Sequence, residues 1–179
     1  MKTQTSWMIV GLCACLLAGG VLGGGDGIAA AAWDDVELRV GQPPPEFSAQ
    51  DLTNHAQTLQ QYRGKVLVLH FWATWCPYCR GEIVELRALQ EQWASKGVAV
   101  VTVSVDENRD RLKRFVERNA LPYAVIFDGE TDASVAARYR IVGVPTTYVI
   151  GRDGRIAFRF DGAGDLLEAV EHALARSGS

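Results

Sequence analysis

Two cysteines stand two residues apart in FWATWCPYC, residues 71–79, directly after a dense apolar run. This spacing allows three kinds of chemistry. Cys76 and Cys79 can bind a metal ion, form a disulfide that pins a loop, or carry electrons as a dithiol–disulfide pair. The choice depends on the other ligands that the chain offers, on the size of the loop that the pair closes, and on the elements that hold the two cysteines.

Metal binding and structural stapling both explain the pair poorly. A closed zinc site needs four ligands, and the chain after residue 32 adds only histidines that are not paired at ligand spacing, so no metal is expected. A disulfide across four residues closes a very small loop and removes little entropy from the unfolded chain. A redox role is therefore favoured. The histidines concerned are His55, His70 and His172.

The sequence around Cys76 predicts a buried strand followed by a helix. KVLVLHFW, residues 65–72, is a continuous apolar run of the kind found in strands covered on both faces. Pro77 suits the first turn of a helix and Gly97 suits its end. Apolar residues recur between them at helical spacing, namely Ile83, Leu86, Leu89 and Trp93.

Cys76 is therefore expected at the amino terminus of a helix. Unpaired backbone N–H groups and the positive end of the helix dipole stabilise a thiolate there, so we expect its pKa below the ~8.5 of a free cysteine. Cys79, one turn further along, is expected to be more buried and less acidic. The pattern predicts that Cys76 attacks first and that Cys79 resolves the mixed disulfide, with no cofactor beyond the pair itself.

The rest of the chain alternates strands with helices and predicts one α/β domain. Its 179 residues are 48% hydrophobic, which is enough for one well-buried core and too few for two. A polar segment with three prolines, residues 40–65, is expected to form a short hairpin anchored by Phe47 and Leu59. Further strands are predicted over 98–106, 124–128 and 146–160, the last range holding two strands around Asp153–Gly154, and helices over 108–120, 132–140 and 165–178.

The strand and helix order implies a mixed central sheet flanked by helices on both faces. The formal charge of −3 comes from acidic and basic residues scattered along the chain. No basic surface is expected from this distribution, so a nucleic-acid partner is disfavoured.

Residues 1–32 are predicted to be an export signal, which leaves a mature domain of residues 33–179. An uncharged apolar stretch, residues 7–22, ends near a cleavage site at Ala30–Ala32. Two alternatives stay open: the stretch remains as a membrane anchor, or Cys15 is lipidated. The location expected in each case is extracytoplasmic, in the periplasm or at the outer face of the cytoplasmic membrane.

Export also bears on the cysteines. Once residues 1–32 are removed, Cys76 and Cys79 are the only two left, so any disulfide of the domain in an oxidising compartment joins them. Cys13 and Cys15 are otherwise small residues compatible with a membrane.

Two segments resemble a known family. HFWATWCPYCRGE, residues 70–82, resembles the active-site segment of the thioredoxin superfamily, and YRIVGVPTTYVIGRDGRI, residues 139–156, is similar to the segment that carries its cis-proline. Together they resemble the TlpA/ResA-type extracytoplasmic thiol-disulfide oxidoreductases, over residues 40–175. The resemblance implies a thioredoxin-like fold with an N-terminal hairpin and an added βα unit over residues 98–119.

The same resemblance implies roles for residues around the pair. The Val144–Pro145 bond is expected to be cis and to face the cysteines, which leaves the Val144 backbone free to pair with an extended client segment. Glu82 corresponds to an acidic residue that can modulate thiol protonation, the alternative being a plain surface glutamate. The residues expected to contact a client are Trp75, Pro77, Tyr78, Val144 and Thr146.

Two residues near the pair allow two interpretations each. His70 stands where thioredoxin has a buried aspartate and the TlpA/ResA-type proteins often have asparagine. It either assists proton transfer or is an ordinary core histidine. Arg80 either favours the Cys76 thiolate electrostatically or is an exposed helical side chain.

The function implied is the reduction of protein disulfides, in this family often during cytochrome c maturation, with electrons supplied by a membrane thiol transporter. Two alternatives compete. A glutathione-linked enzyme is one, because Pro77–Tyr78 is the dipeptide that glutaredoxins carry, and a non-catalytic redox-fold module that binds a partner is the other. A peroxiredoxin is disfavoured because Thr74 lies two residues before Cys76 rather than three.

Overall fold

The computed structural model of the protein describes residues 38–129 and 134–176. The predicted export signal or anchor, residues 1–32, lies outside this part of the chain. Within residues 38–129 and 134–176, no helix combines the length and the apolar character needed to cross a membrane.

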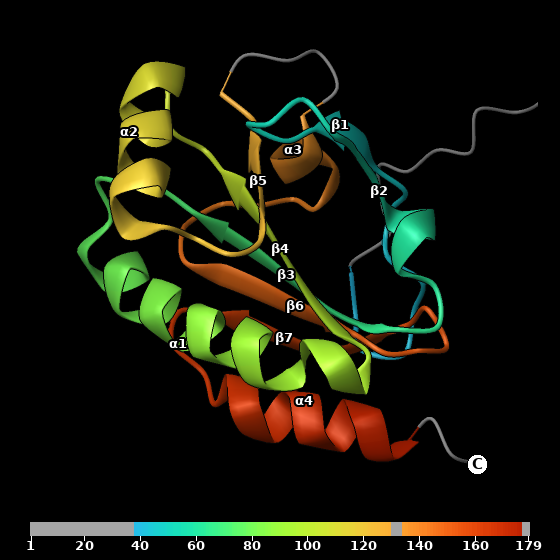
Figure 1. Cartoon of the computed structure of the whole chain (residues 1–179). Coiled ribbons are helices and arrows are strands. Elements are labelled where there is room, and N and C mark those ends of the chain that lie inside the picture. The colour runs from blue at the N-terminus through green and yellow to red at the C-terminus, as the bar shows by residue number, and fades with distance from the viewer. Residues whose placement is uncertain (1–37, 130–133, 177–179) are drawn as a thin grey trace, which may run out of the picture. The chain divides into compact units, whose positions relative to one another are not determined.

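A five-stranded mixed sheet forms the centre of the fold (Figure 1). Its order is β5 (Ala124–Phe127), β4 (Val98–Ser104), β3 (Val66–Trp72), β6 (Thr146–Ile150) and β7 (Ile156–Asp161). Neighbours β3, β4 and β5 run parallel, whereas β6 is antiparallel to β3 and β7 is antiparallel to β6. The predicted mixed sheet is confirmed.

Helices and the polar segment cover the two faces of this sheet (Figure 1). One apolar cluster combines residues of α1 (Pro77–Trp93), α2 (Arg109–Asn119) and α4 (Leu166–Ala175) with one face. A second cluster combines α3 (Val135–Arg138) and the leading segment with the other. That segment forms the predicted hairpin of β1 (Ser48–Gln50) and β2 (Ala56–Thr58), and short 3₁₀ turns follow β2 and α1 at Leu59–Tyr62 and Ala94–Lys96.

Strand β3 is the best-protected element of the sheet. All seven of its residues are buried, because it pairs with β4 on one side and β6 on the other and is covered on both faces. Val66, Val68 and Trp72 belong to the first apolar cluster, and the alternate residues belong to the second. The carboxyl end of β3 is therefore a fixed starting point for the residues that follow.

The helix predicted over residues 132–140 is shorter than expected. In the described part of the chain it covers Val135–Arg138, capped by the Ser134 hydroxyl, which accepts the N–H of Ala137. Arg140 has a φ of 51°, in the left-handed region that an α-helix cannot continue through. This early end frees residues 141–145 to form a loop that turns back toward β3.

The leading segment is anchored as predicted. Phe47 and Leu59 are both buried, and the Phe47 ring meets the Tyr139 ring edge-on with centroids 6.4 Å apart. The Tyr139 hydroxyl donates to the Pro45 carbonyl at 2.9 Å. The segment is thereby tied to the residue that follows α3.

This packing makes Phe47→Ala strongly destabilising, because it removes a buried ring and leaves a cavity against Tyr139. We expect a loss of about 3–5 kcal/mol in unfolding free energy, measured by urea denaturation. Tyr139→Phe, which deletes only the hydrogen bond to Pro45, should cost about 1 kcal/mol. Val40→Ala, at an exposed position, is the control, and a Phe47→Ala protein as stable as this control would contradict the anchoring role.

Candidate active site

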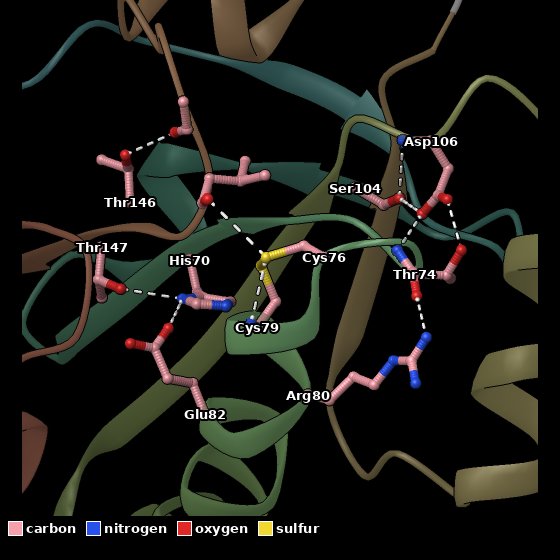
Figure 2. Close-up of a disulfide and its surroundings, with 12 residues drawn as sticks. His70, Thr74, Cys76, Cys79, Arg80, Glu82, Ser104, Asp106, Thr146 and Thr147 are labelled. Carbon is pink, nitrogen blue, oxygen red and sulfur yellow. Dashed lines mark hydrogen bonds and ion pairs between the residues drawn. A yellow bond between two sulfur atoms is a disulfide. The ribbon is translucent and has the colours of Figure 1, made fainter.

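The two cysteines form a disulfide at the junction of β3 and α1, with Cα atoms 5.4 Å apart (Figure 2). Cys76 is the N-cap residue of α1, and Pro77 occupies the first helical turn. The Cys76 Sγ accepts the backbone N–H of Cys79 at 3.2 Å. Cys76 therefore lies where a helix amino terminus stabilises negative charge on sulfur.

Both cysteines are almost inaccessible in the disulfide state. Cys76 is 3% exposed and Cys79 is fully buried, so the predicted difference in burial exists but is small. The residues beside them are open: Trp75 is 54% exposed and Tyr78 is 81% exposed. The rim, rather than the disulfide itself, presents most of the surface that an approaching molecule meets.

The loop before β6 covers the disulfide on one side. The Val144–Pro145 peptide bond is cis, and the Val144 carbonyl oxygen lies 3.8 Å from the Cys76 Sγ. A groove of about 310 Å³ runs beside this loop, and Val142 at its margin is 96% exposed. The groove is lined by Val142, Gly143, Val144, Pro145, Thr146, Arg159, Asp161 and Gly162.

Thr146 lines this groove without offering its hydroxyl to a client. Its side chain is almost fully buried, and its Oγ1 donates to the Gly143 carbonyl at 2.8 Å. The Pro145 carbonyl is also engaged, because it accepts the Gly162 N–H at 2.9 Å. Thr146 therefore shapes the loop. Because its side chain is buried, little of it is accessible for the predicted contact with a client.

Glu82 is buried, so the interpretation as a surface glutamate is wrong. Only 6% of the residue is exposed, and its Oε2 lies 3.7 Å from the Nδ1 of His70 (Figure 2). Burial raises the pKa of Glu82 to about 7, and the nearby negative charge of Glu85 adds to this effect. Near neutral pH, this carboxyl group can therefore gain or release a proton one helical turn from Cys79.

His70 is a fully buried core residue with one unused nitrogen. Its Nδ1 lies 2.9 Å from the Thr147 Oγ1, whereas its Nε2 has no hydrogen-bond partner within residues 38–129 and 134–176. Burial lowers the pKa of His70 to about 3, so the ring is neutral at neutral pH. Its contact with Glu82 is consequently not an ion pair, and the two groups form a buried polar cluster with Thr147 beneath α1.

A second polar cluster lies on the other side of the disulfide in Figure 2, and sequence reasoning did not find it. The buried Asp106 carboxylate accepts hydrogen bonds from Thr74 and Ser104, and the Arg80 guanidinium reaches the Thr74 carbonyl at 3.4 Å. Arg80 thus contacts the loop before Cys76. Asp106 lies two residues after the end of β4. Because the parallel strands β3 and β4 end at the same edge of the sheet, its position near the CxxC loop could have been predicted from the sequence.

The described residues contain no group of three or more His, Cys, Asp or Glu side chains placed to bind a metal ion. The arrangement around the disulfide instead supports thiol chemistry. A sulfur at a helix terminus favours the thiolate that disulfide exchange needs, and a groove beside it gives a partner molecule access.

Comparisons with known proteins agree with this chemistry. Residues 40–159 match the model of the AhpC/TSA family. The chain is 33% identical over 125 residues to the thioredoxin-like protein YneN of Bacillus subtilis, covering 68% of this chain and 71% of the relative. It is 32% identical over 119 residues to the thiol-disulfide oxidoreductase ResA of Geobacillus kaustophilus, covering 66% of this chain and 67% of the relative.

A solved structure is similar throughout the domain. The thiol:disulfide interchange protein of the thioredoxin family from Chlorobium tepidum superposes with a TM-score of 0.64 at 28% identity. The likeness covers 78% of this chain and 99% of that structure.

The raised pKa of Glu82 predicts a pH-dependent stability. A carboxyl whose pKa rises from 4.5 to about 7 on folding stabilises the fold below pH ~4.5, and this contribution is lost as the pH rises to ~7. Glu82→Gln removes the effect. Relative to this variant, the oxidised wild-type protein should lose roughly 1–3 kcal/mol of unfolding free energy between pH 5 and pH 8 in urea denaturation.

The exposed Glu171, in α4, supplies the matched control. The unfolding free energy of Glu171→Gln should change between pH 5 and pH 8 by the same amount as that of the wild type. If Glu82→Gln also tracked the wild type, Glu82 would titrate like a solvated carboxyl in the folded protein.

Proposed function

The chain belongs to the AhpC/TSA family and is a thiol-disulfide oxidoreductase with a thioredoxin-like fold, and we propose that it reduces protein disulfides outside the cytoplasm. The observation that carries the proposal is the combination of a helix-capping disulfide with an apolar, solvent-exposed rim. In this proposal the redox-active group is the Cys76–Cys79 disulfide, and no bound cofactor takes part.

The rim supports a protein client rather than a small thiol. Among described residues, six large apolar side chains are prominently exposed, and Trp75, Tyr78 and Val142 lie beside the disulfide or its groove. Exposed apolar residues concentrated at one place favour contact with another protein. The Val144 backbone next to the Cys76 sulfur can pair with an extended segment of that protein.

The reaction follows from the two sulfur positions. The Cys76 thiolate attacks one sulfur of the client disulfide, forming a mixed disulfide and releasing the other client sulfur as a thiolate. The Cys79 thiolate then attacks the Cys76 sulfur and expels the second client sulfur. The client gains two electrons and, after protonation, two thiols, while the Cys76–Cys79 disulfide forms.

Glu82 is the group that we propose accepts and returns the proton of Cys79. Cys79 must lose its proton before it can attack, and it lies fully buried with Glu82 one turn along the same helix. A carboxyl with a pKa of about 7 can take up or return a proton at neutral pH. Neutral His70, bound to Thr147 and adjacent to Glu82, fixes the polar surroundings of this carboxyl.

The proposed location and partners rest on sequence features. Residues 7–22 have the apolar character of an export signal or membrane anchor, which leads to the periplasm or the outer face of the cytoplasmic membrane. A membrane thiol transporter would re-reduce the Cys76–Cys79 disulfide. Cytochrome c or its assembly factors are the proposed clients, in line with the resemblance to TlpA/ResA-type proteins.

The direction of electron flow can be tested by equilibrating the full chain with glutathione in mild detergent. A reductant should have a midpoint potential near the approximately −270 mV of thioredoxin. A midpoint near about −120 mV, typical of a strongly oxidising exported protein, would overturn the reductant proposal.

The client can be captured with Cys79→Ser. Because the second thiolate needed to expel the client is missing, this variant should accumulate mixed disulfides at Cys76 in cells. The complexes should survive non-reducing electrophoresis and disappear with a reductant. Cys76→Ser, which lacks the proposed nucleophile, is the matched control and should trap none.

Mass spectrometry of the captured species separates the candidate functions. Exported cysteine proteins, especially cytochrome c or its assembly factors, are the expected result. Glutathione alone would indicate the glutaredoxin-like function that the Pro77–Tyr78 dipeptide suggests. A folded, exported variant that captures neither would indicate a non-catalytic module, and trapping by Cys76→Ser instead would reverse the roles of the two cysteines.

A further inference from the structure

Three residues, Ala73 to Trp75, connect the fixed end of β3 to Cys76, and a buried carboxylate holds the middle one. Asp106 Oδ2 accepts the Thr74 N–H at 2.9 Å, and Oδ1 accepts the Thr74 hydroxyl at 2.6 Å. Ser104, the last residue of β4, donates its hydroxyl to Oδ2 at 2.6 Å. Asp106, Thr74 and Ser104 are all buried, so water competes little for these bonds.

Ala73 packs in the first apolar cluster, but few other polar contacts fix this loop. Trp75 is half exposed, and the Arg80 guanidinium approaches the Thr74 carbonyl only at 3.4 Å. The Cys76 N–H bonds to the Ala73 carbonyl at 3.1 Å, which shapes the turn without tying it to another strand. The Thr74–Asp106 bonds are therefore the main polar link between this loop and β4, the neighbour of β3 (Figure 2).

The importance of this link depends on the redox state. In the disulfide, the bond to Cys79 also ties Cys76 to α1. In the dithiol that tie is absent, and the loop backbone must keep the Cys76 sulfur where it accepts the Cys79 N–H. Loosening the loop therefore raises the free energy of the dithiol, with its Cys76 thiolate, more than it raises the free energy of the disulfide.

We propose that Asp106 is a positioning residue of the redox centre, which stabilises the dithiol relative to the disulfide by holding Thr74 in the loop before Cys76. It contacts neither the cysteines' client nor the reacting sulfurs. The proposal extends the thiol-disulfide chemistry of the chain and is independent of the direction of electron flow.

Two substitutions separate position from charge. Asp106→Ala removes every bond that the carboxylate makes with Thr74 and Ser104, and it keeps only the backbone N–H bond to the Ser104 hydroxyl. Asp106→Asn keeps the shape: its carbonyl oxygen can accept the Thr74 N–H, and its amide can donate to a rotated Thr74 hydroxyl. If position matters, the Asn variant behaves like the wild type and the Ala variant does not.

Asp51 provides a matched control. It is also a buried carboxylate that accepts several bonds, from Thr53, His55 and Gln57, but it holds the β1–β2 hairpin and not the CxxC loop. Asp51→Ala should destabilise the protein in both redox states alike. Its effect measures what loss of a buried carboxylate does when the cysteines are not involved.

The test measures the dithiol–disulfide equilibrium of the full chain against glutathione, with the titration of the Cys76 thiolate by absorbance. Asp106→Ala should shift the equilibrium about tenfold toward the disulfide, equivalent to ~30 mV, and raise the Cys76 pKa toward that of a free cysteine. For Asp51→Ala and Asp106→Asn, the dithiol–disulfide equilibrium constant should stay within about twofold of the wild-type value, a change worth only ~0.4 kcal/mol.

Two outcomes would overturn the proposal. One is an Asp106→Ala shift no larger than that of Asp51→Ala, which would make Asp106 a purely structural residue. The other is an equal shift in Asp106→Asn, because this variant keeps the shape and the bonds to Thr74, so loop position could not be the cause. Should Asp106→Ala fail to fold, Thr74→Val deletes only the Thr74 hydroxyl bond, and it must shift the equilibrium in the same direction by a smaller factor or the proposal fails.

Discussion

The structure depends on one constraint: a sulfur must be held at the amino terminus of α1 although it sits on a short loop. Strand β3 meets this constraint, because it is paired on both sides and covered on both faces, so its end cannot shift without disturbing the core. Pro77 starts the helix immediately after Cys76. The Cys76 sulfur is thus placed by a fully buried strand, at the end of a helix that favours its thiolate.

Two buried polar clusters flank the disulfide and serve different ends. Glu82 of α1 meets His70 and Thr147 of the sheet, and burial raises the pKa of Glu82 to about 7, as the proposed proton carrier requires. Asp106, with Thr74 and Ser104, holds the backbone that leads to Cys76. Among the described residues, His70 Nε2 and Glu82 Oε2 of the first cluster have no hydrogen-bond partner, whereas both carboxylate oxygens of Asp106 accept hydrogen bonds, as expected of an anchor.

The proposed client surface beside the disulfide includes a different part of the chain. Early termination of α3 lets residues 141–145 fold back over the disulfide, where the Val144 carbonyl approaches Cys76. The groove beside this loop and the exposed Trp75 and Tyr78 surround the sulfur with apolar surface. The proposed client surface and the disulfide are therefore adjacent in space although they come from separate segments of the sequence.

The sequence by itself determined the elements and the chemistry. The unbroken apolar run before Cys76 identified a doubly covered strand, Pro77 marked the helix start, and the short spacing of the cysteines excluded a useful staple, because these are local properties. Only the tertiary structure decided that Glu82 is buried and that His70 Nε2 has no hydrogen-bond partner within residues 38–129 and 134–176. The parallel strands already implied that Asp106 lies near the CxxC loop, but its bonds to Thr74 are visible only in the fold. Burial, and with it the pKa of Glu82, depends on which side chains from distant segments close over a position, and no local pattern specifies that.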